Sequence, residues 1–287
     1  MIRKGASEAE IRRAEARRAV GSHLNVKWID AQVPDDDKTL ASQKEAVQDS
    51  ISRMKEFSKG VPGLVFIFSD EEMPAPKKAK NYVPQPTRQA KDCAIAWAEL
   101  FQTEGDYSVF IPGRFFNVYR ADATVVTPRR NKYLCSEKSP IVVLTDKDGK
   151  VIDIMEGRAA VKRSKVVTEM TEVLRKDGYI QSGNSFTRLQ ELMVSLEKVE
   201  ISVLSVKGMV SAAASKLAEA QSSKAAQKKG GELTSSGKAA KEKMDKVESQ
   251  LKEQQQAKYK ILDEEYALLK ELGLPAAKLP PAPKQPE

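Results

Sequence analysis

A seam of apolar residues with coiled-coil spacing runs through the C-terminal third of this chain. Its members follow one another in alternating steps of three and four residues: Leu189, Leu192, Leu196, Val199, Val203, Val206, Val210, Ala213, Leu217 and Ala220. A seam of this kind is buried only against another helix. The sequence therefore predicts a long helix that needs a helical partner along one side.

The predicted partner is a second helical stretch further along the chain. Its apolar residues are Ala240, Met244, Val247 and Leu251, followed in a shifted phase by Tyr259, Leu262, Tyr266 and Leu269. The linking segment from Ser222 to Lys238 is small and polar, with Gly230-Gly231 inside it. We therefore expect an antiparallel helical hairpin, although the same heptads equally allow pairing with a second copy of the chain.

The first helix is apolar beyond its seam. Five further residues widen the apolar stripe: Met193, Val194, Ile201, Leu204 and Met209. One partner helix does not cover so wide a stripe, so the pattern indicates docking on the chain's own globular part, on a second copy or on another protein.

Composition limits the classes of partner. Lys and Arg number 48 against 40 Asp and Glu, which gives a formal net charge of +8, but only 6% of residues are aromatic. The charges are interspersed, so a platform of stacked aromatic and basic residues for nucleic acid is not visible. A nucleic-acid role remains an alternative, carried by the scattered Lys and by four arginines of a charged helix predicted over Ala6 to Val20: Arg12, Arg13, Arg17 and Arg18.

The middle of the chain alternates predicted helices and strands. A short strand-like segment, Leu24 to Ile29, comes first. The helices are expected at Leu40 to Phe57, Arg88 to Gln102, Pro128 to Leu134 and Val161 to Leu174, and the strands at Leu64 to Phe68, Phe115 to Ala121, Ile141 to Leu144 and Val151 to Met155. Apolar runs such as Leu64 to Phe68 are typical of central strands that are covered on both faces. The fold class is therefore α/β, with a central mixed sheet and flanking helices.

One segment of this region resembles the thioredoxin-like fold. Ser139-Pro140, the apolar strand after it, Asp148-Gly149-Lys150 and Gly157 are similar to that family's cis-proline, hairpin and following glycine. The resemblance covers about Leu40 to Lys176 and makes Pro140 the candidate cis-proline. The family's redox chemistry uses a Cys-x-x-Cys pair at a helix N-terminus, and the matching region, Ser69 to Arg88, has no cysteine. The resemblance thus implies a domain without oxidoreductase activity.

The two cysteines have different expected roles. Cys93 falls inside a predicted helix and is expected to be buried, because a free cysteine behaves as a small apolar residue. Cys135 is the candidate reactive thiol, since four basic neighbours favour a thiolate: Arg129, Arg130, Lys132 and Lys138. A single-cysteine redox protein is therefore a second alternative.

No cofactor or metal site is expected. The one histidine, His23, falls in an expected loop, so a histidine-based metal site or a catalytic triad has no support. Asp70, Glu71 and Glu72 cluster after the first central strand and are interpreted as a hydrated acidic loop. No Gly-rich phosphate loop follows a strand.

These observations divide the chain into four parts. They are an N-terminal charged helix (1–23), a thioredoxin-like domain (24–180), a coiled-coil hairpin (181–272) and a Pro-rich tail (273–287). No apolar run approaches the roughly 20 residues of a membrane span and no signal peptide is visible, so a cytoplasmic location is expected. The leading hypothesis is a non-catalytic interaction or structural component that binds a protein partner, or a second copy, through the hairpin.

Overall fold

A computed structural model describes residues 6–24, 28–30, 60–69, 72–73, 83, 85–101, 106–122, 139–180, 184–222 and 234–286. The chain divides into two compact units. Unit 1 consists of Met1–His23, Glu191–Glu271 and Leu279–Glu287, and unit 2 of Leu24–Gln190 and Leu272–Lys278. Each unit is described by itself.

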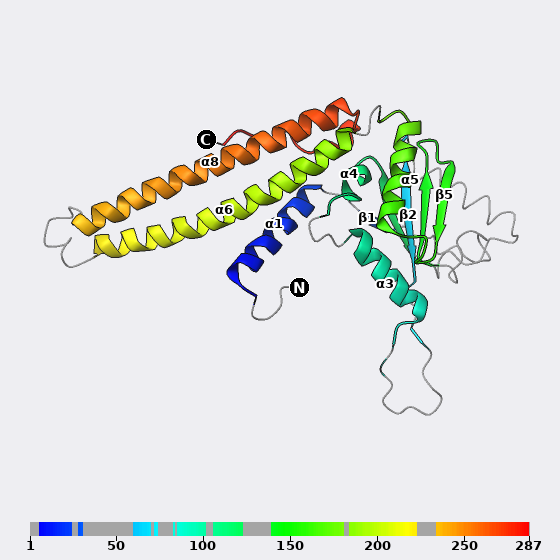
Figure 1. Cartoon of the computed structure of the whole chain (residues 1–287), viewed down its shortest axis with the longest axis horizontal. Coiled ribbons are helices and arrows are strands. Elements are labelled where there is room, and N and C mark those ends of the chain that lie inside the picture. The colour runs from blue at the N-terminus through cyan, green and yellow to red at the C-terminus, as the bar shows by residue number, and fades with distance from the viewer. Residues whose placement is uncertain are drawn as a thin grey trace, which may run out of the picture. The chain divides into compact units, whose positions relative to one another are not determined.

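Unit 2 is built on a five-stranded mixed sheet (Figure 1). The strands are β1 (Trp28–Asp30), β2 (Gly63–Phe68), β3 (Asn117–Asp122), β4 (Ile141–Thr145) and β5 (Val151–Glu156). Their order across the sheet is β1-β3-β2-β4-β5. β3 runs parallel to β1 and β2, whereas β4 is antiparallel to both β2 and β5. The mixed α/β class predicted from the sequence is confirmed.

Both faces of the central strands are buried, as continuous apolar runs require. One face carries an apolar cluster of Val65, Ile67, Tyr119, Ala121, Ile141 and Val143, with Ile154 packed against it. On the other face, Phe66 of β2 meets Trp97 of α3 (Arg88–Phe101) edge to face, with ring centroids 5.2 Å apart. The apolar side of α3 therefore anchors this helix on the sheet, and its polar side faces away.

A tight turn and short helical elements complete unit 2. Gly149, with φ of 78°, closes the turn between β4 and β5, where the Asp146 carboxylate accepts hydrogen bonds from the backbone N–H groups of Asp148 and Lys150. The helix α4 (Phe110–Gly113) precedes β3, and α5 (Arg163–Lys176) follows β5 and packs on β4. A 3-10 turn, η2 (Ala276–Lys278), adds Lys278, whose ammonium donates to the carbonyl oxygen of Phe116.

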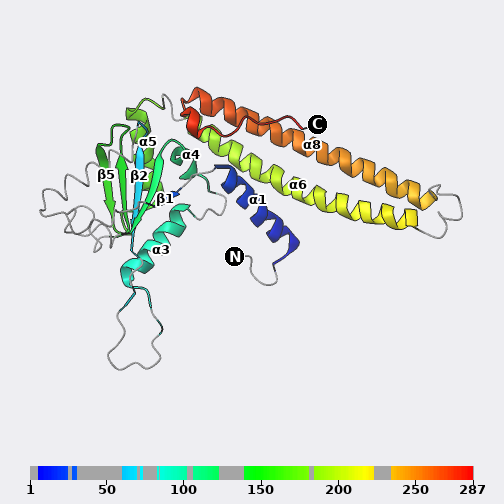
Figure 2. The same ribbon diagram turned by 180° about the vertical axis from the view of Figure 1, so that it is seen from behind.

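Unit 1 is helical. Its elements are α1 (Glu8–Leu24), most of α6 (Asn184–Ser222) and α8 (Ser235–Glu271). Figures 1 and 2 show α6 and α8 side by side and running in opposite directions. At about 1.5 Å per residue, their 39 and 37 residues correspond to roughly 55–60 Å each. The helix α1 begins with a capping box: Glu10 accepts from the Ser7 backbone N–H, and Ser7 Oγ accepts from the Glu10 N–H.

Two expectations near the N-terminus are wrong. The first helix does not end at Val20 but continues through His23 to Leu24, and the first strand is Trp28–Asp30 rather than Leu24 to Ile29. The helix extends because Val20 and Leu24 are both buried on one side of it. The helices expected at Leu40 to Phe57 and at Pro128 to Leu134 lie outside the described residues.

Candidate interaction surfaces

The predicted seam lies along α6 with uneven burial. Leu189, Leu192, Leu196, Val203 and Ala213 are buried, whereas Val199, Val206, Val210, Leu217 and Ala220 are partly exposed. Burial is thus nearly complete in the first half of the helix and incomplete in the second half. The second half of the seam keeps apolar surface in contact with water.

The partner seam on α8 is more polar than the sequence analysis assumed. Its 3–4 spacing continues from Leu251 through Gln254, Lys258 and Ile261 to Glu265, which is 0% exposed. The set expected in shifted phase contains Leu269, which is also 0% exposed, but it leaves out Glu265. Continuing the heptad across its polar positions adds Glu265.

An ion pair joins the two long helices at one of these polar positions. Lys258 Nζ of α8 lies 2.5 Å from Glu200 Oε1 of α6. Glu200 is buried, and the side chain of Lys258 is 36% exposed. A buried carboxylate needs a matching cation, so this pair is satisfied only when Glu200 and Lys258 face each other. The pair therefore specifies the register of α6 against α8.

The helix α1 is held to both long helices. Arg17 Nε donates to Glu197 Oε1 of α6 at 3.0 Å, and His23 Nε2 contacts Glu265 Oε2 of α8. Ala16 and Val20 are both 0% exposed. His23 is therefore a residue of a packed helix, and its expected place in a loop is wrong. Arg17 is occupied within the chain.

The five residues that widen the apolar stripe of α6 do not share one environment. Met193 is buried, Val194, Ile201 and Leu204 are partly exposed, and Met209 is 51% exposed. The stripe is thus largely covered at its start, and Met209 is the large apolar side chain of α6 that remains most open among the described residues.

By length and composition, the stretch Phe186–Ser222 is apolar enough to cross a membrane, with a mean hydropathy of 1.2 over its most apolar window. This corrects the expectation that no run approaches that length. The window contains at most two charged residues, and 11% of it is buried. A single helix with these properties is weak evidence for a membrane span.

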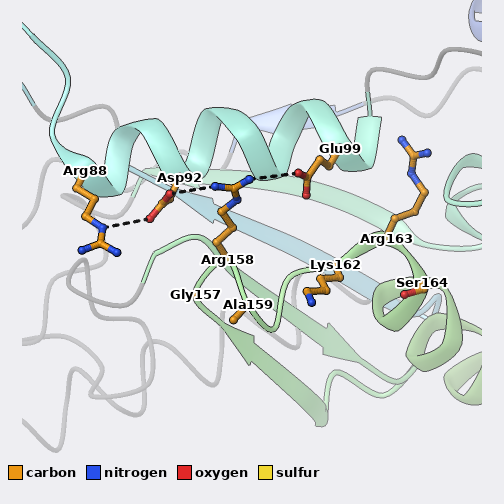
Figure 3. A pocket seen from close by; sticks show the side chains of 9 residues that line it. All are labelled: Arg88, Asp92, Glu99, Gly157, Arg158, Ala159, Lys162, Arg163 and Ser164. Carbon is orange, nitrogen blue, oxygen red and sulfur yellow. Dashed lines mark ion pairs between the residues drawn. The ribbon is translucent and has the colours of Figure 1, made fainter.

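A groove lies on unit 2 between α3 and the segment that joins β5 to α5. Its volume is about 850 Å³, and it is lined by Arg88, Asp92, Glu99, Gly157, Arg158, Ala159, Lys162, Arg163 and Ser164 (Figure 3). Arg88, Asp92 and Glu99 come from one side of α3, at the helical spacing i, i+4 and i+11. The opposite wall follows β5, where Gly157, with φ of 76°, turns the chain toward α5.

Charges of both signs face one another across this groove. Figure 3 shows the Arg158 guanidinium between Asp92 and Glu99, with nitrogen-to-oxygen distances of 3.9 and 3.6 Å. Arg163 Nη1 donates to Asp106 Oδ2 at 2.7 Å. Burial alone would raise the pKa of Asp106, but hydrogen bonds from Ser108 and the charge of Arg163 hold this pKa below its usual value. Asp106 therefore fixes Arg163 as an ionised pair at the edge of the groove.

The candidate cis-proline lies next to the groove. The peptide bond Ser139-Pro140 is cis, and the Gly157 N–H donates to the Pro140 carbonyl oxygen at 2.8 Å. Cys93 is buried in α3, as expected, and its Sγ accepts from the backbone N–H of Ser69 at 3.2 Å. The candidate thiol Cys135 lies outside the described residues, as do Asp70 and Glu71.

Metal binding finds no support in the described part of the chain, where no three His, Cys, Asp or Glu residues form a group that could hold an ion. The sequence predicts the seam of α6 but gives no sign of the groove on unit 2. The two walls of the groove are about 60 residues apart in the chain and become neighbours only through the sheet.

Comparisons with family models, with curated proteins and with solved structures give no match for this chain.

Proposed function

We propose that the chain is a non-catalytic interaction or structural component of a larger protein assembly. It binds through a redox-inactive thioredoxin-like domain, formed by unit 2, and through a coiled-coil arm, formed by α6 and α8. The observation that carries the proposal is the pair of long helices, whose seam is closed in its first half and keeps apolar surface exposed in its second half.

The order and directions of the five strands support a thioredoxin-like domain, as does the cis-proline before β4. A redox role for this domain would place a thiol in the first turn of α3. In this chain the helix begins at Arg88, after Pro86-Thr87, and Cys93 lies buried beyond the first turn. Unit 2 accordingly acts as a binding scaffold.

The arm supports an interaction role because its length exceeds what packing on a small sheet requires. The ion pair of Glu200 with Lys258 fixes its register there, while Val206, Val210 and Leu217 keep partial exposure further along. Apolar residues at these heptad positions pack best against a further helix. The second half of the arm is therefore the surface that a helical segment of a partner protein would cover.

The test is native co-purification of the full chain carrying single changes on the arm. Met209→Lys places a charge on the exposed apolar residue of α6, and Ser211→Lys places the same charge on an exposed polar position of the same helix. The two sites point about 200° apart around the helix, at 100° per residue. Both variants should fold equally well, since neither residue is buried.

We expect a stoichiometric protein partner to co-purify with the original chain and with Ser211→Lys, and to be lost with Met209→Lys. Recovery of the chain without any protein, or equal recovery of the partner with both variants, would refute the arm as the binding surface. Flotation with lipid vesicles in place of protein capture would instead assign the apolar stretch of α6 to a membrane.

A further inference from the structure

The groove of unit 2 is elongated. Arg88 and Glu99 mark two ends of its α3 wall and are separated by eleven residues, or roughly 16 Å at 1.5 Å per residue. An extended polypeptide advances about 3.3 Å per residue, so about five residues span the wall. The dimensions thus fit a segment of extended chain better than they fit a single small ion.

Hydrogen-bond donors in the groove outnumber the acceptors that reach them. Arg88 Nε lies 4.0 Å from Asp92, and the two contacts of Arg158 measure 3.9 and 3.6 Å, all beyond hydrogen-bond distance. The Arg88 side chain is 94% exposed and that of Arg158 is 48% exposed. Each guanidinium carries five N–H donors and no acceptor. Among the described residues, these two arginines therefore face the groove with donors that no protein oxygen uses.

The wall opposite α3 is the more basic one. Arg158, Lys162 and Arg163 lie within six residues, and the Ser164 hydroxyl follows at the start of α5. Arg163 is held in place by Asp106, and its Nε is buried without a hydrogen-bond partner among the described residues. Lys162 and Ser164 are exposed. The wall therefore presents three positive charges, of which Arg163 is held rigidly and Arg158 and Lys162 are accessible.

We propose that this groove binds an extended acidic segment of a protein partner, with the segment's carboxylates on Arg158, Lys162 and Arg88. The inference rests on the proposed interaction role and gives unit 2 its ligand chemistry. Carboxylates of the bound segment accept charge-assisted hydrogen bonds from the guanidinium groups, and these bonds are shorter and stronger than the long ion pairs that the arginines make within the chain. Asp92 and Glu99 repel a continuous run of negative charge, so the groove favours carboxylates that alternate with neutral residues.

The test uses the full chain and a fluorescein-labelled peptide of alternating Glu and Ser, followed by fluorescence anisotropy at low salt. A matched peptide of alternating Gln and Ser has the same length and no charge. We expect the Glu peptide to bind, the Gln peptide not to bind, and added salt to weaken the complex, because exposed charges are screened.

Two variants locate the binding. Arg158→Gln and Lys162→Gln should each weaken the Glu peptide about twofold to fivefold, the range of one exposed ion pair. Lys176→Gln, at the exposed C-terminal end of α5 and outside the groove, should leave the affinity unchanged. Inorganic phosphate at equal ionic strength should compete no better than chloride does.

Absence of binding to the Glu peptide would overturn the inference, and so would equal weakening by the Lys176→Gln control. Strong competition by phosphate would assign the groove to a small anion and would also overturn it. These outcomes leave the arm untouched: a chain that still captures its partner through α6 keeps the proposed function and loses only the acidic ligand.

Discussion

Removing the cation from the Glu200 and Lys258 pair tests whether polar residues fix the register of the arm. Lys258→Met keeps most of the aliphatic side chain and deletes the charge, which leaves the buried Glu200 carboxylate without its partner. A hydrogen bond to a charged group contributes about 1.5–3 kcal/mol. Because the Lys258 side chain is about one-third exposed and water screens part of the interaction, we expect a loss near the lower end, about 1.5 kcal/mol.

The double variant Glu200→Leu with Lys258→Leu separates the value of the pair from the cost of breaking it. Replacing a buried ion pair by apolar residues of similar size is often neutral or stabilising by about 1 kcal/mol or more. We therefore expect the double variant to be at least as stable as the original chain. The single change is destabilising because it leaves the Glu200 carboxylate buried without a cation, whereas the double change leaves no unpaired charge.

Native-state hydrogen exchange is the appropriate assay, because a chain with two units need not unfold in one step. Amides of α6 around Glu200 and of α8 around Lys258 should exchange about tenfold faster in Lys258→Met, which corresponds to about 1.4 kcal/mol. Exchange in α5 should be unchanged. Unaltered protection in Lys258→Met, or a double variant less stable than the single one, would refute a register-fixing ion pair.

Three further outcomes follow from other contacts. Leu196→Ala, at a seam position that is 1% exposed, should lower the free energy of opening of α6, measured by hydrogen exchange, by about 2–5 kcal/mol. Leu217→Ala, at a partly exposed position, should lower it by less. His23→Ala removes the partner that α1 offers to the buried Glu265, so trypsin should cleave the arginines of α1 faster than in the original chain. Burial lowers the pKa of Lys278 to about 8, so the unfolded chain binds more protons between pH 8 and 10.5; unit 2 should gain stability as the pH rises through that window, and Lys278→Met should abolish the gain in pH-dependent denaturation.

The elements that the sequence predicts well are those whose pattern is local. The strands β2 and β4 are continuous apolar runs, and α3 and α5 have amphipathic periodicity. Each signal lies within one element and needs no knowledge of what packs against it.

The positions that sequence reasoning missed are charged residues at the contacts between the helices: Glu265 is buried and Lys258 is partly exposed. Lys258 and Glu265 occupy heptad positions of α8, and a reading that reserves the seam for apolar residues places both on the surface. They pair with Glu200 and His23, which lie 58 and 242 residues away in the chain. Pairing over such separations is a property of the packed helices and has no local signature.

The polar seam also explains why the two halves of the arm differ. Where α1 packs, the core contains charged side chains that are satisfied only by partners at fixed positions, so α1, α6 and α8 exclude other arrangements there. Beyond Val203 the seam holds small and branched apolar residues with no paired charge among the described ones, and apolar heptads alone discriminate poorly between partners. The first half thereby specifies the chain's own fold, and under the proposed function the second half is the part that accepts a helix from another protein.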